Sequence, residues 1–201
     1  MVRHLGVVSL VSLVSLLVAL PVLAAEEADH EIHQELRGIL LTVQNAVNTG
    51  NFDAMLPVLS KDIEATTITQ EVMRGHQEVS AYFKKWFGPG GYLKKLEMQF
   101  TADALTELSA DKTWGVVRGS AIESYTLADG RKYDMKSRWT ATVVKEADGK
   151  WRLRTIHFGT NFLDNPILDA AKQAVVKYAA VSGGIGLLVG ALLGFMLARR
   201  K

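Results

Sequence analysis

An alternating pattern of apolar and polar residues lies in residues 131–160, which read RKYDMKSRWTATVVKEADGKWRLRTIHFGT. The apolar members recur with a spacing of two on both sides of a central turn: Tyr133, Met135, Trp139, Ala141, Val143, Trp151 and Leu153. This period is that of a β-strand with one buried face. The turn contains Asp148-Gly149, a pair that suits the tight connection of a hairpin. The stretch therefore predicts two antiparallel strands.

The same period continues toward the N-terminus of this hairpin. Leu96, Met98 and Phe100 alternate with polar residues, and Ala110-Asp111-Lys112 and Asp129-Gly130 indicate further turns. The sequence thus predicts an antiparallel meander of four strands, near residues 93–109, 113–127, 131–146 and 150–160.

Before residue 90 the spacing of the apolar residues is that of helices. A stripe with spacings of three and four runs through residues 31–47: Ile32, Leu36, Ile39, Leu40, Val43 and Val47. We expect a second, short helix at residues 52–59, a strand at 62–68, and a third helix between Gly75 and Gly88. Three N-terminal helices before one sheet indicate an α+β fold, with the helices packed on one face of a curved antiparallel sheet.

Four runs in the sequence follow one another in an order typical of a known superfamily. They are Val47-Asn48-Thr49-Gly50-Asn51-Phe52-Asp53, Leu59-Ser60-Lys61-Asp62, Arg74-Gly75-His76-Gln77-Glu78-Val79 before Tyr82-Phe83, and Asp148-Gly149-Lys150-Trp151-Arg152-Leu153 with His157. Residues 30–163 thereby resemble the nuclear transport factor 2-like superfamily, nearest its SnoaL-like branch. The resemblance implies a cone-shaped domain that encloses a pocket and is commonly dimeric through its sheet. It implies no particular reaction, because the superfamily includes several enzyme classes and many proteins that only bind or assemble.

Two apolar segments flank this domain. Residues 1–25 have the layout of a secretory signal peptide, with Arg3 before an apolar run and Ala24-Ala25 at its end; an uncleaved anchor is the alternative. Residues 179–198 carry no charge and are long enough to span a membrane once. Because residues 199–201 are all basic, the positive-inside rule predicts that they are cytoplasmic and that the domain lies outside.

We therefore divide the chain into a signal peptide (1–25), a SnoaL-like domain (26–163), a juxtamembrane helix (164–178), a transmembrane helix (179–198) and a cytoplasmic tail (199–201). We expect a single-pass protein of the inner (cytoplasmic) membrane, with its domain on the periplasmic or extracytoplasmic side. Small residues recur every four positions in the transmembrane helix, at Ser182, Gly186, Gly190 and Gly194. This stripe resembles the glycine-zipper anchors of small bacterial inner-membrane proteins and predicts helix association in a homodimer.

The charge of the chain argues against nucleic acid as a partner. The net charge is +2 over 201 residues, and the part between the two apolar segments carries 19 basic and 21 acidic residues. This near balance provides no basic patch of the kind that nucleic acids require. The chain has no cysteine and none of the common metal or phosphate motifs, so we expect no cofactor and no metal.

His157 is the candidate catalytic residue. Its alternation with Trp151 and Leu153 predicts a position on the buried face, where a histidine can act as acid or base near neutral pH. A hydrogen-bonded core histidine is the alternative. The ketosteroid isomerase branch has a tyrosine and an aspartate at positions that here hold Val43 and Thr67, which argues against that mechanism.

Seven further side chains are candidates to line the pocket: Tyr82, Trp86, Trp114, Tyr125, Trp139, Asp62 and Glu64. The alternatives are that the aromatic residues fill the core and that the two carboxylates lie on a solvated edge. Arg118, Arg138 and Arg154 form either an anion site or an exposed face paired with Glu123 and Asp134.

Two functions remain open. One is a membrane-anchored extracytoplasmic module that binds a small apolar molecule or assembles, without a catalytic site. The other is a pocket enzyme of isomerase, dehydratase or hydrolase type, with His157 as acid or base on a small apolar substrate. A cavity that joins His157 to Asp62, Glu64 or Tyr125 would favour the enzyme.

Overall fold

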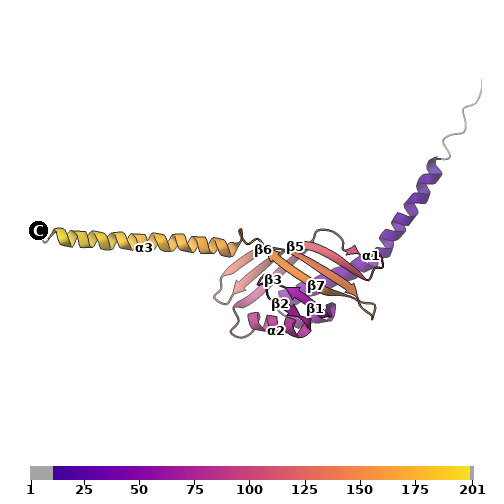
Figure 1. The fold of residues 1–201 in the computed structure, drawn as a ribbon, viewed down its shortest axis with the longest axis horizontal. Coiled ribbons are helices and arrows are strands. Elements are labelled where there is room, and N and C mark those ends of the chain that lie inside the picture. The colour runs from indigo at the N-terminus through magenta and orange to yellow at the C-terminus, as the bar shows by residue number, and fades with distance from the viewer. Residues whose placement is uncertain (1–10, 200–201) are drawn as a thin grey trace, which may run out of the picture.

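The computed structural model describes residues 11–199, which form a curved sheet domain and two extending helices (Figure 1). The elements are α1 (Val11–Thr49), η1 (Phe52–Val58), β1 (Leu59–Thr66), β2 (Val72–Arg74), α2 (Gly75–Phe87), β3 (Leu93–Ala102), β4 (Glu107–Leu108), β5 (Trp114–Leu127), β6 (Lys132–Lys145), β7 (Trp151–Thr160) and α3 (Pro166–Ala198). The predicted α+β class is confirmed. Figure 1 shows α3 and the N-terminal part of α1 leaving the sheet in different directions.

Polar side chains near the end of α1 hold this helix against the edge strand β3. The side chain of Gln44 accepts a hydrogen bond from the backbone N–H of Phe100 at 3.0 Å, and that of Asn48 accepts one from the N–H of Met98 at 2.6 Å. These bonds use backbone groups that an edge strand would otherwise leave unpaired. The helix ends at Thr49, and the following Gly50 has a φ of 70°, a conformation that glycine adopts without strain.

The sheet is mixed, with the strand order β2-β1-β7-β6-β5-β3 and with β4 paired to β5. β1 runs parallel to β7, so the expectation of a wholly antiparallel sheet is wrong at this pair. Parallel neighbours are connected through intervening chain rather than by a tight turn, so no local signal marks them. The strand predicted at 93–109 is likewise divided into β3 and β4.

β7 contains a bulge that changes which of its side chains face the core. Val143 of β6 pairs with Leu153, but its neighbour Thr142 pairs with Thr155, so Arg154 is an extra residue on β7. An extra residue inverts the alternation of the strand beyond it. Beyond the bulge, Phe158 is therefore buried, and the side chains that alternate with it along the strand point outward.

The core lies between the sheet and the helices α1 and α2, which contact β3, β7, β1 and β2. Trp139 of β6 is buried there and donates a hydrogen bond from its indole N–H to the carbonyl of Ser120 at 3.0 Å. Gly119 lies opposite it on β5. A Cβ at Gly119 would lie 2.2 Å from the Thr101 carbonyl oxygen and 2.3 Å from the Trp139 ring, so only glycine leaves room for the indole.

α3 begins at Pro166 and continues without interruption to Ala198. The side chain of Asn165 accepts a hydrogen bond from the N–H of Leu168 at 2.9 Å, and Pro166 takes the first helical position. None of its residues is buried. Within the described residues, α3 is the one candidate membrane-spanning helix by length and composition, which indicates single-pass anchoring.

Candidate functional site

Two cavities lie between the sheet and the helices. Four side chains line both cavities and separate one from the other: Val43, Phe100, Leu153 and Ile156. The outer cavity, between α1, the segment after β3 and the middle of the sheet, has a volume of about 400 Å³. The inner cavity, between α1, α2 and the sheet, has a volume of about 80 Å³.

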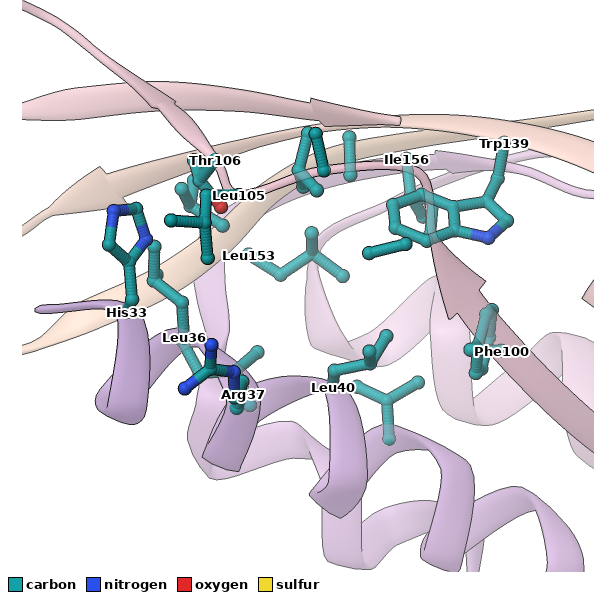
Figure 2. Close-up of a pocket in the computed structure, with 17 residues that line it drawn as sticks. His33, Leu36, Arg37, Leu40, Phe100, Leu105, Thr106, Trp139, Leu153 and Ile156 are labelled. Carbon is teal, nitrogen blue, oxygen red and sulfur yellow. The ribbon is translucent and has the colours of Figure 1, made fainter. Parts of the chain in front are cut away.

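The outer cavity is mainly apolar and has its polar groups at one end. Figure 2 shows His33 and Arg37 of α1 and Thr106 near that end, with Phe100 and Trp139 at the other. The apolar lining comes from α1, β3, the segment after β3, and the three central strands: Leu36, Ile39, Leu40, Val43, Phe100, Ala102, Ala104, Leu105, Val117, Trp139, Ala141, Val143, Leu153 and Ile156. This composition suits an apolar molecule with one polar end.

The two basic residues at this end lie one turn apart on α1. Partial burial lowers the pKa of His33, an effect that the nearby Asp29 carboxylate opposes and the Arg37 charge reinforces. His33 is therefore mainly neutral at neutral pH, where it can donate or accept a hydrogen bond. Arg37 supplies the positive charge.

The inner cavity contains a buried carboxyl group. Glu123 of β5 is 3% exposed and accepts hydrogen bonds from the hydroxyls of Tyr125 and Ser137. Burial raises the pKa of Glu123, against the effect of these two hydrogen bonds. The carboxyl group therefore keeps its proton to a higher pH than a solvated glutamate does.

Two tyrosines accompany this carboxyl group in the inner cavity. Burial raises the pKa of Tyr125, and the neighbouring Glu123 charge raises it further. Burial also raises the pKa of Tyr82 of α2, whose hydroxyl lies 3.0 Å from the Thr67 hydroxyl. The Glu123 charge raises the pKa of both Tyr82 and Tyr125, so the three groups form one polar cluster in the apolar wall of the inner cavity.

Several sequence-predicted site residues lie elsewhere. His157 is exposed, on the outer face, because the bulge at Arg154 inverts the alternation on which its prediction rested. Asp62 and Glu64 are also exposed, and Glu64 forms an ion pair with Arg74 at 3.1 Å. None of the three predicted residues lines either cavity.

The aromatic candidates divide between the cavities and the surface. Tyr82 and Tyr125 line the inner cavity, and Trp139 lines the outer one without filling it. Trp86 instead donates a hydrogen bond to Glu71 at 2.9 Å, and Trp114 is 49% exposed. Neither of these two tryptophans lines the outer or the inner cavity.

Two of the three arginines of the predicted cluster form separate ion pairs on an exposed face, and Arg154 donates a hydrogen bond to the backbone carbonyl of Asp62 instead. Arg118 pairs with Glu107 and Arg138 with Asp103, rather than with Glu123 and Asp134. Glu123 is thus a site residue that the sequence reading placed on the wrong face. The alternation of β5 could have identified it, because Glu123 lies on the same face of the strand as the buried Ala121 and Leu127.

Comparison with known proteins places the domain in a family. The profile of the SnoaL-like domain matches residues 42–154, from the second half of α1 to β7. The chain belongs to this family. The resemblance drawn from the sequence is confirmed for the domain. No curated protein matches the chain.

Solved structures share the fold at low sequence identity. A hexachlorocyclohexane dehydrochlorinase of type 2 aligns with a TM-score of 0.58 and 12% identity, over 68% of this chain and 90% of its own. A candidate scytalone dehydratase from Novosphingobium aromaticivorans gives 0.57 and 12%, over 68% and 89%. A ketosteroid isomerase-like protein from Erwinia carotovora atroseptica gives 0.54 and 14%, over 64% and 95%. These likenesses show the nuclear transport factor 2-like fold and leave function to the site.

Proposed function

We propose that this protein is a membrane-anchored binding protein whose SnoaL-like domain takes up a small, mainly apolar molecule in the outer cavity. The observation that carries the proposal is the cavity itself, with about 400 Å³ of space and polar groups at one end only. Small-molecule sites occupy about 300–1,000 Å³ and have mostly apolar walls. The inner cavity, at about 80 Å³, is too small for such a ligand alone.

The proposal includes the placement of the chain in the membrane. Residues 1–25 act as a signal peptide, residues 26–163 form the extracytoplasmic domain, and residues 164–178 connect it to the span at 179–198. The support is the apolar length of α3 and the basic residues that follow it. The stripe of Ser182, Gly186, Gly190 and Gly194 supports association of two copies through α3.

Photolabelling with 3-trifluoromethyl-3-phenyldiazirine, a small neutral apolar probe, tests ligand uptake. The full chain is embedded in lipid nanodiscs, and the labelled peptides are mapped by mass spectrometry. We expect label in the segment 100–106 as well as in α3, which lies in the lipid and serves as an internal standard.

Two neighbouring substitutions on α1 make the test specific. Leu40→Trp places a large side chain in the outer cavity and should lower the label in segment 100–106 relative to α3. Leu41→Trp is the matched control, because Leu41 is 55% exposed and lines neither cavity. The proposed uptake would be ruled out if segment 100–106 of the wild type carried no label, or if Leu40→Trp left the label in this segment unchanged.

A second candidate function is acid–base catalysis at the inner cavity. The observation that favours it is Glu123, whose pKa is raised by burial next to two tyrosines. On this reading Glu123 replaces His157 as the acid or base of a pocket enzyme. Incubation of the full chain with a cell metabolite extract should then consume a compound that the Glu123→Gln variant leaves intact.

A further inference from the structure

The polar end of the outer cavity has an uncompensated positive charge. Among residues 29–199, whose side chains the structure describes, no carboxylate forms an ion pair with Arg37. Most other arginines of the domain do have such a partner, as Arg118 and Arg138 do. The cavity therefore presents a guanidinium with open hydrogen-bonding capacity at the border of its apolar wall.

Two acidic side chains in this part of the chain, Asp29 and Glu35, are engaged with groups other than Arg37. Asp29 forms an ion pair with Lys112, in the turn before β5. Glu35 accepts a hydrogen bond from the backbone N–H of Trp151 at 2.9 Å. Neither carboxylate pairs with Arg37, so the charge at the polar end remains positive.

Two further polar groups line the same end of the cavity and can contribute to a site for an anionic head. His33 lies one turn before Arg37 on the same helix, and its lowered pKa leaves a neutral ring that can donate one hydrogen bond. The Thr106 hydroxyl reaches the same end from the segment after β3 (Figure 2). A guanidinium binds a carboxylate through two parallel hydrogen bonds, which is stronger than a contact with a neutral group.

We infer that the ligand of the outer cavity is an anionic amphiphile, such as a single-chain fatty acid, with its head at Arg37 and its apolar chain toward Phe100 and Trp139. This inference rests on the proposed uptake of apolar molecules and adds the class of ligand. The volume of about 400 Å³ lies at the lower end of the range for ligand sites, which fits one chain. Leu105, 58% exposed at the polar end, covers the first part of that chain.

Competition against the diazirine label tests the class of ligand. Dodecanoate and dodecanol have the same chain and differ in the charge of the head. Each is added to the full chain in nanodiscs, and the label in segment 100–106 is measured relative to that in α3, which corrects for partition into the lipid. We expect dodecanoate to displace the label at a concentration about five- to tenfold lower than dodecanol does.

Substitution of Arg37 tests whether the charged head of the ligand binds at this residue. In Arg37→Gln, dodecanoate should displace the label only at the concentration that dodecanol requires, and the concentration for dodecanol should not change. Arg37→Lys should keep part of the preference for dodecanoate. Arg74→Gln is the matched control, because Arg74 is an exposed arginine that lines neither cavity. Equal competition by acid and alcohol, or a preference that survives Arg37→Gln, would overturn the anionic class. In that case the label itself would still support uptake, whereas its absence from segment 100–106 would remove both proposals.

Discussion

Glu123 connects the stability of the domain to pH. It is a buried carboxyl group whose pKa in the folded state lies above the ordinary value of 4.5, mainly because of burial. The folded protein therefore binds more protons than the unfolded chain at pH values between these two pKa values. The free energy of unfolding consequently falls as the pH rises through this window and levels off above the folded pKa.

Glu123→Gln should remove this dependence, because the amide cannot ionise. We predict that the free energy of unfolding of the wild type declines relative to that of Glu123→Gln as the pH rises above 4.5, the ordinary pKa of a glutamate. Urea unfolding of the full chain in detergent, followed by tryptophan fluorescence, measures the difference. Asp134→Asn is the control, because Asp134 is an exposed carboxylate on the next strand. Parallel pH curves for wild type and Glu123→Gln would show that folding does not raise the pKa of the Glu123 carboxyl group.

Gly119 determines whether Trp139 can occupy its place in the outer cavity wall. Gly119→Ala would force the Thr101 carbonyl or the Trp139 ring to move, because both lie within 2.3 Å of the added carbon. We predict a loss of about 1–3 kcal/mol in the free energy of unfolding, from overpacking in the core. The same urea experiment measures it. Gly159→Ala has no heavy atom within 4 Å of its added carbon and should change little; equal effects of the two substitutions would contradict this explanation.

The site residues differ in how well the sequence could reveal them. Tyr82, Tyr125 and Trp139 follow from the helical and alternating patterns, and Glu123 would have followed from the same alternation. His157 could not be placed correctly, because a single bulged residue inverts its strand and no residue type marks that bulge.

Among the elements, α3 has the simplest test. Gly190→Ile should weaken association of two α3 helices, since a β-branched side chain separates backbones that pack closely at small residues. A reporter of transmembrane helix dimerisation measures the change. Leu192→Ile is the control, because residue 192 lies on the opposite side of the helix from Gly190. An unchanged signal for Gly190→Ile would exclude the small-residue stripe as the contact.

The elements themselves were largely predictable where local patterns are strong. Residues 31–47 of α1, the helix after Gly75 and the three strands β5, β6 and β7 all follow from apolar spacing and turn residues. The short strands β2 and β4 carry too few residues for a pattern. The parallel pair β1 and β7 depends on contacts about 90 residues apart, which no local spacing encodes.

For the whole molecule, we predict that residues 26–178 lie outside the cytoplasmic membrane and residues 199–201 inside. Protease added to intact spheroplasts should then degrade the domain, because the basic tail holds the C-terminus of α3 in the cytoplasm. A cytoplasmic marker protein should remain intact in the same sample. Protection of the domain until the membrane is opened would reverse the topology.

Uptake of an apolar molecule by the outer cavity is tested most directly by methyl NMR of the full chain in nanodiscs during titration with hexylbenzene. Leu36, Ile39 and Ala141 line the outer cavity, so their methyl signals should shift and saturate. Ile63, which lines only the inner cavity, and the buried Leu127, which lines neither, should keep their signals. Unchanged signals of Leu36, Ile39 and Ala141, or equal shifts at Ile63 and Leu127, would contradict a ligand in the outer cavity.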